Sequence, residues 1–136
     1  FAALQRRVAG CFDFAITLHI PYKLCDYKPA YGEIFAPELS GYDFWGYGDM
    51  DLVFGDLRAY FTEDKLRKYD KFYAFGHLSL YRNTPENNAV YRQPVGMDYR
   101  KAFTTREIAV FRPAGLCGHH QGQRPTGNHR CGDYGR

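Results

Sequence analysis

The chain has 136 residues, which is enough for one domain and too few for two. Aromatic residues make up 18% of it, a share that can build a hydrophobic core and excludes general disorder. No apolar run approaches the roughly 18 residues that a membrane-spanning helix needs. We therefore expect no transmembrane segment, and peripheral association of a full-length protein with a membrane stays open.

Charge and composition change after residue 111. Residues 1–111 carry 14 Lys or Arg and 14 Asp or Glu, whereas residues 112–136 carry four Arg against Asp133, which supplies the whole net charge of +3. The second segment also holds 6 of the 14 Gly and a single large aliphatic side chain, so it cannot bury enough apolar surface to offset the entropy lost on ordering. We predict a folded domain over 1–111 and a disordered or out-of-frame tail over 112–136. The basic charge belongs to the tail and does not indicate a nucleic-acid partner.

The chain has four cysteines: Cys11, Cys25, Cys117 and Cys131. They form no convincing disulfide framework, which favours reduced thiols and a cytoplasmic location. The two tail cysteines lie near His119, His120 and His129, a combination that suggests zinc. Zinc modules space their paired ligands more widely and surround them with apolar residues, so the pattern favours an unstructured tail over a zinc site.

The first half of the chain shows three periodic segments. Residues 12–20 alternate apolar with smaller or polar side chains, which predicts a half-buried strand. In residues 22–39 the apolar side chains recur mostly at steps of three or four, which predicts a helix that begins near Pro29 or is kinked by it. Residues 42–47 are almost wholly aromatic and predict a buried strand.

Helix-start signals mark the second half. Thr62 precedes two acidic residues and is the expected N-cap of a short polar helix, and Thr84 followed by Pro85 marks another helix start. Two short strands and a further helix are predicted at 71–75, 78–81 and 98–110. Strands that alternate with helices predict an α/β domain. At most four short strands are few for an independent doubly wound sheet, which indicates an incomplete domain.

Two carboxylates follow the aromatic strand, in Asp49-Met50-Asp51. In extended backbone, residues i and i+2 point to the same side, roughly 7 Å apart at Cα, so both carboxylates can hold a divalent cation. Neighbouring glycines allow close approach of a ligand, and open α/β folds bind ligands at the carboxyl ends of strands. A D-x-D tripeptide is also common on solvated turns, and that interpretation stays open.

Two weaker clusters carry alternatives of their own. Lys23, Asp26 and Lys28 could grip a phosphate or a sugar hydroxyl, although the pattern favours a solvated helix face with an Asp–Lys pair. His77, followed by residues 81–83 (Tyr-Arg-Asn), is a third candidate, and a histidine flanked by apolar strand residues is more often a hydrogen-bonded, partly buried side chain.

Three motifs in order carry a resemblance to a known family. They are PYKLCDYKPAYG at 21–32, YDFWG running into DMDLVFG at 42–55, and KYDK at 68–71 with GHLSLYRN at 76–83. Together they resemble the signature of a bacterial family of uncharacterised glycosyltransferases encoded among polysaccharide biosynthesis genes. That family is distantly similar to DxD-containing sugar transferases, which include capsular polysaccharide enzymes and the Och1-type mannosyltransferases. The resemblance covers about residues 10–110.

The resemblance implies a GT-A-like fold and a metal-dependent sugar transferase. Asp49 and Asp51 would form the DxD motif that binds Mn²⁺ or Mg²⁺ and the pyrophosphate of the donor, and Asp26 and Lys28 would face that donor. The implied partners are a nucleotide sugar and a glycan or lipid-linked acceptor, in the biosynthesis of bacterial surface polysaccharide such as lipopolysaccharide. His77 matches a family position to which no role is attached.

The chain also departs from that family at both ends. Its first residues correspond to a point after the first strand and its nucleotide-binding loop, and the expected acidic, Trp-containing continuation after Phe111 is replaced by the tail. The resemblance therefore implies an incomplete GT-A-like fold, a fragment that we expect to be inactive by itself. The main alternative is a non-catalytic carbohydrate-binding or assembly module whose Tyr and Trp side chains stack on sugars. A metal-dependent hydrolase would need more acidic or His ligands near the DxD motif.

Overall fold

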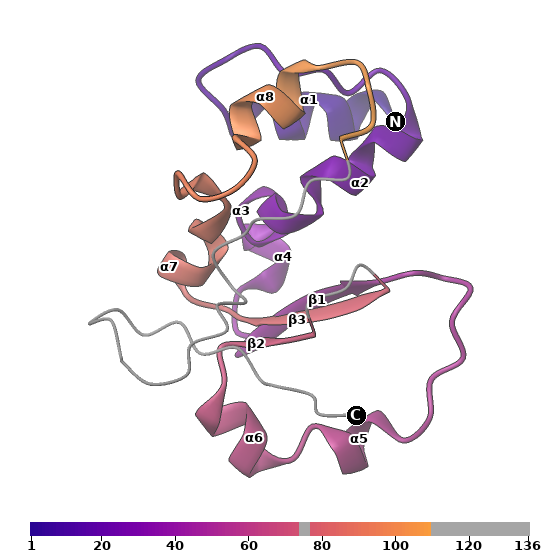
Figure 1. The fold of residues 1–136 in the computed structure, drawn as a ribbon, viewed down its shortest axis with the longest axis vertical. Coiled ribbons are helices and arrows are strands. Elements are labelled where there is room, and N and C mark those ends of the chain that lie inside the picture. The colour runs from indigo at the N-terminus through magenta and orange to yellow at the C-terminus, as the bar shows by residue number, and fades with distance from the viewer. Residues whose placement is uncertain (74–76, 110–136) are drawn as a thin grey trace. The chain divides into compact units, whose positions relative to one another are not determined.

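The chain forms two compact units in this computed structural model, which describes residues 1–73 and 77–109. The helical unit combines residues 1–41 with the stretch that begins at Asn88, and the sheet unit contains residues 42–87 (Figure 1). The predicted tail, with its cysteines and histidines, lies outside the described residues.

The helical unit is built from short helices. In chain order they are α1 (Ala2–Gly10), η1 (Pro21–Lys23), α2 (Leu24–Tyr27), η2 (Lys28–Ala30), α3 (Tyr31–Ile34), α4 (Ala36–Leu39), η3 (Val90–Arg92) and α8 (Tyr99–Thr104). Most of the stretch 22–39 is helical and interrupted at Pro29, as predicted, but it is divided into more short helices than a single kink would give. Pro29 lies in η2 and Pro37 in α4, and each lacks the N–H that a continuous helix needs.

Residues 12–20 form no strand, contrary to the prediction. Their alternation nevertheless decides which side chains turn inward. The side chains that pack into or against the core are Phe12, Phe14, Ile16 and Leu18. Instead of joining a strand ladder, the backbone bonds to the C-terminal part of α8, where the N–H of Thr17 donates to the carbonyl of Phe103 at 2.7 Å. The pattern predicted burial correctly and predicted the hydrogen-bonding partner wrongly.

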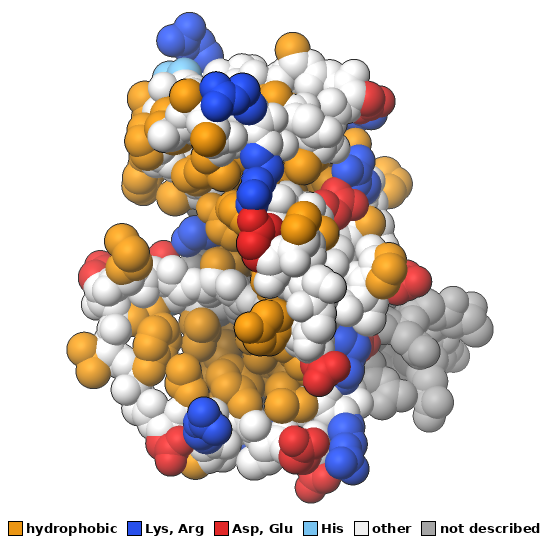
Figure 2. Space-filling model, turned by 180° about the vertical axis from the view of Figure 1, so that it is seen from behind, with side chains coloured by type: hydrophobic (Ala, Val, Ile, Leu, Met, Phe, Trp, Pro, Cys, Tyr) orange, Lys and Arg blue, Asp and Glu red, His pale blue; other side chains and the backbone are white. Residues whose placement is uncertain are grey.

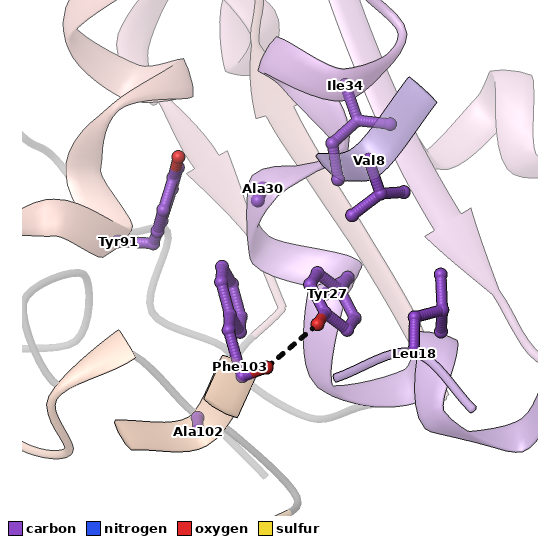
Figure 3. Close-up of a cluster of buried hydrophobic side chains, with 8 residues drawn as sticks. All are labelled: Val8, Leu18, Tyr27, Ala30, Ile34, Tyr91, Ala102 and Phe103. Carbon is purple, nitrogen blue, oxygen red and sulfur yellow. Dashed lines mark hydrogen bonds between the residues drawn. The ribbon is translucent and has the colours of Figure 1, made fainter. Parts of the chain in front are cut away.

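The core of the helical unit joins segments from both ends of its sequence. Its buried members are Val8, Leu18, Tyr27, Ala30, Ile34, Tyr91, Ala102 and Phe103 (Figure 3). The rings of Tyr27 and Phe103 stack with their centroids 4.3 Å apart. The hydroxyl of Tyr27 donates to the carbonyl of Phe103 at 3.1 Å, the bond drawn in Figure 3. One aromatic pair therefore fixes α2 against α8 by both stacking and a hydrogen bond.

The sheet unit holds three antiparallel strands and short helices. They are β1 (Phe44–Gly48), α5 (Leu57–Tyr60), α6 (Glu63–Lys68), β2 (Lys71–Phe72), β3 (Leu78–Arg82) and α7 (Pro85–Asn88), the last ending at the unit boundary. The strand order is β1-β3-β2, so β3 is central and β1 is an edge strand among the described residues (Figure 1). The protein is therefore mixed α/β with a small antiparallel sheet.

The aromatic strand alternates its side chains between the two faces of the sheet. Trp45 pairs with Tyr81 across β1 and β3, and their rings stack with centroids 4.7 Å apart. Trp45 is 4% exposed, whereas the ring of Phe44 lies 6.0 Å from that of Phe72. The prediction of a buried strand is confirmed only for Trp45, because the other residues of β1 are half-buried or exposed and β1 lies at the edge of the described sheet. The strand runs over 44–48 rather than 42–47.

The predicted helix starts are confirmed. Thr62 occupies the N-cap position of α6 without a capping bond from its side chain, whereas the hydroxyl of Thr84 accepts a hydrogen bond from the backbone N–H three residues later at 3.2 Å. Asp98 caps α8 by accepting from the N–H of Arg100 at 2.9 Å, and the helix ends at Thr104, earlier than predicted. These signals succeed because a cap and its partner lie within one turn.

Candidate functional site

Asp49 and Asp51 lie where β1 ends. Asp49 directly follows the strand, and its N–H donates to the carbonyl of His77 at 2.9 Å. Met50 and Asp51 form a turn. The extended geometry assumed for the whole D-x-D tripeptide is therefore wrong, because the strand conformation ends before Asp51. The side chain of Asp49 is 35% exposed and Asp51 is exposed, so both carboxylates are accessible to solvent.

His77 lies beside Asp49. Its Nδ1 atom is 3.1 Å from Oδ2 of Asp49, and its side chain is 77% exposed. The sequence favoured a partly buried histidine at this position, which is wrong. It also treated Asp49 and His77 as separate candidates, whereas the pairing of Gly48 with Leu78 makes them the next opposed residues along β1 and β3. The register of the two strands is the signal that joins them.

A glycine lets β1 lie this close to β3. A Cβ atom on Gly46 would lie 2.4 Å from the backbone carbonyl oxygen of Ser79, a distance that a side chain cannot accept. No such contact exists at Gly55, in the loop beyond Asp51. Gly46 therefore fixes the approach of the two strands whose ends carry Asp49 and His77.

The loop around Asp51 exposes apolar side chains. Met50 and Val53 are fully exposed, and Phe54 and Leu57 are exposed by 43% and 37%. Figure 2 shows hydrophobic side chains gathered on the floor of a hollow that this loop borders, in the lower part of the view. The carboxylates thus occur in a loop that also offers apolar surface to a bound molecule.

The residues that follow His77 serve the sheet itself. Tyr81 is 1% exposed and stacked on Trp45. Nε of Arg82 donates to Oδ1 of Asp70 at 2.8 Å, and the guanidinium also donates to one backbone carbonyl in the last turn of α6 and to one just after it. The amide of Asn83 donates to a carbonyl just before β1 at 2.9 Å. These contacts assign the Tyr-Arg-Asn run to the architecture of the sheet unit.

In the helical unit, Lys23 and Asp26 form a buried ion pair. Both side chains are 0% exposed, and Nζ of Lys23 lies 2.7 Å from Oδ2 of Asp26. Nζ also donates to the carbonyls of Ala102 and Glu107 at 2.9 and 2.5 Å, while the N–H of Ala109 donates to Oδ2 of Asp26 at 2.9 Å. The sequence favoured an Asp–Lys pair on a solvated helix face. The pair is present, but the prediction that it lies on a solvated face is wrong, because both side chains are buried.

The predicted donor-facing residues therefore have an environment unlike that of the DxD motif. Asp26 is enclosed, and Lys28 is half-buried in η2. Both belong to the helical unit, whereas Asp49 and Asp51 belong to the sheet unit. The proximity of the two pairs stays a prediction.

The donor atoms at the end of β1 suit a hard or borderline cation. Carboxylate oxygens are what Mg²⁺ and Mn²⁺ prefer, and an imidazole nitrogen is tolerated by Mn²⁺. Within residues 1–73 and 77–109, no group of three or more His, Cys, Asp or Glu side chains is placed to hold a metal ion.

Comparison with known protein families places the chain in a family without an assigned function. A family model, described as a family of unknown function (DUF6625), matches residues 1–121. No curated protein and no solved structure matches the chain. Among the described helices the longest, α1, has nine residues, well short of the roughly 20 that cross a bilayer.

Proposed function

We propose that this chain, which belongs to the DUF6625 family of unknown function, is part of a metal-dependent glycosyltransferase that uses a nucleotide-sugar donor. The observation that carries the proposal is the end of β1, where the accessible carboxylate of Asp49 is bonded to His77 and followed by the exposed Asp51. The motifs at 21–32, 42–55 and 76–83 support the same function, with a role in bacterial surface polysaccharide biosynthesis and a GT-A-like fold for the complete protein.

The charges at this site explain why the reaction would need a cation. A sugar diphosphate brings concentrated negative charge, which Asp49 and Asp51 alone would repel. A divalent ion held by these carboxylates would supply the positive charge that neutralises the diphosphate leaving group. Asp49 and Asp51 would hold the ion by oxygen, and the exposed apolar loop would contact the less polar parts of the donor or acceptor. The acceptor is a glycan or a lipid-linked glycan.

The two predicted donor-facing residues take different roles in this proposal. The carboxylate of Asp26 is fully buried and bonded to Lys23 and Ala109, which supports a role in holding the α2–η2 segment in place. Lys28 follows directly in η2 and is half-buried, and its contact with the donor phosphates stays a prediction from the resemblance.

Calorimetry of this chain tests the proposal. Nucleoside diphosphates such as UDP and GDP, and their sugar conjugates, are titrated with and without Mn²⁺. We expect Mn²⁺ to tighten binding in the wild type, because metal and diphosphate each relieve the repulsion that the other suffers, and we expect Asp51→Asn to abolish this coupling. Asp64→Asn is the matched control, because Asp64 is also exposed and lies on α6. Equal affinity with and without Mn²⁺ in all three proteins would exclude the metal role.

A second candidate function is a non-catalytic carbohydrate-binding module. The hydrophobic hollow bordered by the exposed apolar loop favours it, because sugar rings pack on apolar and aromatic surfaces. Titrations of the same proteins with oligosaccharides, with and without Mn²⁺, separate the two candidates. A carbohydrate-binding module would bind oligosaccharides without Mn²⁺ and would bind them equally well after Asp51→Asn.

A further inference from the structure

We propose that the two chain connections between the units form a hinge, about which the sheet unit turns as a rigid body. The chain passes between the units twice, because the sheet unit of residues 42–87 interrupts the helical unit. The first connection is residues 40–41, after α4, and the second is residues 88–89, from the last residue of α7 to the start of η3. Such hinges, made of a few residues at the ends of elements, commonly let proteins open and close around ligands. The inference goes beyond the proposed function and does not depend on it.

On the side of the sheet unit, Asn83 ties the two connections together. Its backbone N–H donates to the carbonyl of Asp43 at 2.8 Å, and its side-chain amide donates to the carbonyl of Tyr42 at 2.9 Å. The pair of Phe44 and Arg82 follows directly in the β1–β3 ladder. The sheet unit is therefore held together from its first residue onward, which suits a body that moves as one piece.

On the side of the helical unit, Glu33 makes the equivalent link. Its carboxylate accepts hydrogen bonds from the hydroxyl of Tyr91 and from Nη2 of Arg92, the latter at 2.7 Å. Glu33 lies on α3, ahead of the first connection, and both partners lie on η3, directly after the second. Tyr91 is also a member of the buried core. Both parts of the helical unit are thus fixed close to the connections, so bending is confined to the few residues between the two links.

The backbone at both connections suits this bending. Gly41 has a φ of 86°, in the left-handed region that favours glycine, and a Cβ atom there would meet no atom of the described residues within 4 Å. Glycine is therefore needed at this position for its backbone rotation and not for close packing. Ala89 has a φ of −94° and a ψ of 0°, a sparsely populated combination. Because the two connections are short and are tied together on either side, they allow rotation mainly about the line that joins them.

Residual dipolar couplings of the backbone amides, measured by NMR on the full chain, test the inference. Couplings from residues 42–73 and 77–87 report on the sheet unit, and those from 1–41 and 88–109 report on the helical unit. We expect each unit to fit one alignment tensor of its own, and we expect the two tensors to differ in magnitude, because turning about the hinge averages the couplings. A single tensor that fits both units equally well would show that the connections are rigid and would overturn the inference.

The same measurement on Gly41→Ala tests where the chain bends. Alanine disfavours the left-handed region, so the variant should change the orientation of one tensor relative to the other while the fit within each unit stays as good. Gly10→Ala is the matched control, because Gly10 also has open space at its Cβ position but lies in the helical backbone of α1. An orientation that changes no more in Gly41→Ala than in the control would overturn the hinge at this position. The wild-type comparison needs no substitution, so it decides the inference even where a variant does not fold.

Discussion

The helical unit and the sheet unit treat similar charged residues in opposite ways. Lys23 and Asp26 are 0% exposed, and the backbone groups of Ala102, Glu107 and Ala109 that bond to them belong to the helical unit itself. Asp49 and His77 form a pair of comparable length at the surface of the sheet unit, followed by the exposed Asp51. The first pair is enclosed in a way that suits stability, whereas the second is accessible in a way that suits binding. An acidic residue beside a basic side chain therefore indicates nothing about function until its exposure is known.

The largest expected effect comes from opening the buried pair. Asp26→Ala leaves the ammonium of Lys23 in the interior without its counter-charge, which should lower the free energy of unfolding by about 3–5 kcal/mol. Urea denaturation followed by circular dichroism measures the loss. Arg67→Ala is the control, because Arg67 pairs with Glu63 on α6 with both side chains more than three-quarters exposed. That variant should change stability little. A loss for Asp26→Ala no larger than that of the control would contradict the contrast between the two units.

A smaller loss of stability is expected from a substitution between the closely packed strands β1 and β3 of the sheet unit. Gly46→Ala places a Cβ atom against the carbonyl of Ser79, so β1 must move away from β3 at a cost of about 1–3 kcal/mol. Gly55→Ala meets no neighbouring atom and serves as the control. Differential scanning calorimetry compares the two variants. Equal unfolding temperatures would mean that β1 and β3 are less closely packed than described.

The smallest expected effect is a dependence of the free energy of unfolding on pH, which arises from buried tyrosines in the helical unit. Burial raises the pKa of Tyr27, and burial together with the carboxylate of Glu33 raises the pKa of Tyr91, both in the helical unit. Above about pH 10 these tyrosines ionise in the unfolded chain and stay protonated in the folded one, so stability falls as pH rises, by up to about 1.4 kcal/mol per pH unit for each.

Urea titrations between about pH 9 and pH 11, the range around the ordinary tyrosine pKa, measure this slope. Tyr27→Phe should make the slope shallower, because the phenylalanine has no proton to lose. Tyr22→Phe, at a side chain that is 67% exposed, should leave it unchanged. A steeper or unaltered slope in Tyr27→Phe would argue against a buried, protonated phenol.

Features of the fold that depend on neighbours in sequence could be predicted from it. The N-caps Thr62 and Thr84 were found because the cap and its helix are adjacent. The alternation over 12–20 identified the inward side chains, but no local signal shows whether a strand partner exists, and the backbone bonds to α8 instead. The broken helix over 22–39 shows how proline overrides an apolar period.

In the candidate site, too, local features could be predicted from the sequence and contacts between distant residues could not. Asp49 was predicted as a site residue because it follows an aromatic strand, and the strand is present. Its contact with His77 could not be predicted, because the register between β1 and β3 joins residues 28 positions apart. The burial of Asp26 likewise depends on a partner 83 positions away, the backbone of Ala109. Sequence patterns identified the residue types, and nonlocal pairing decided their environments.

The contacts of Lys23 have a consequence for the order in which the chain folds. Its ammonium bonds to carbonyls 79 and 84 positions farther along the chain. Formation of the helical unit therefore closes a long loop in the sequence, and this loop contains the described part of the sheet unit. Closing so large a loop is entropically costly and slow compared with pairing β1 and β3. During synthesis, residues 1–41 must wait until Glu107 and Ala109 have left the ribosome, whereas residues 42–87 are complete earlier. We therefore expect the later-encoded sheet to be the first part of this protein to acquire its structure.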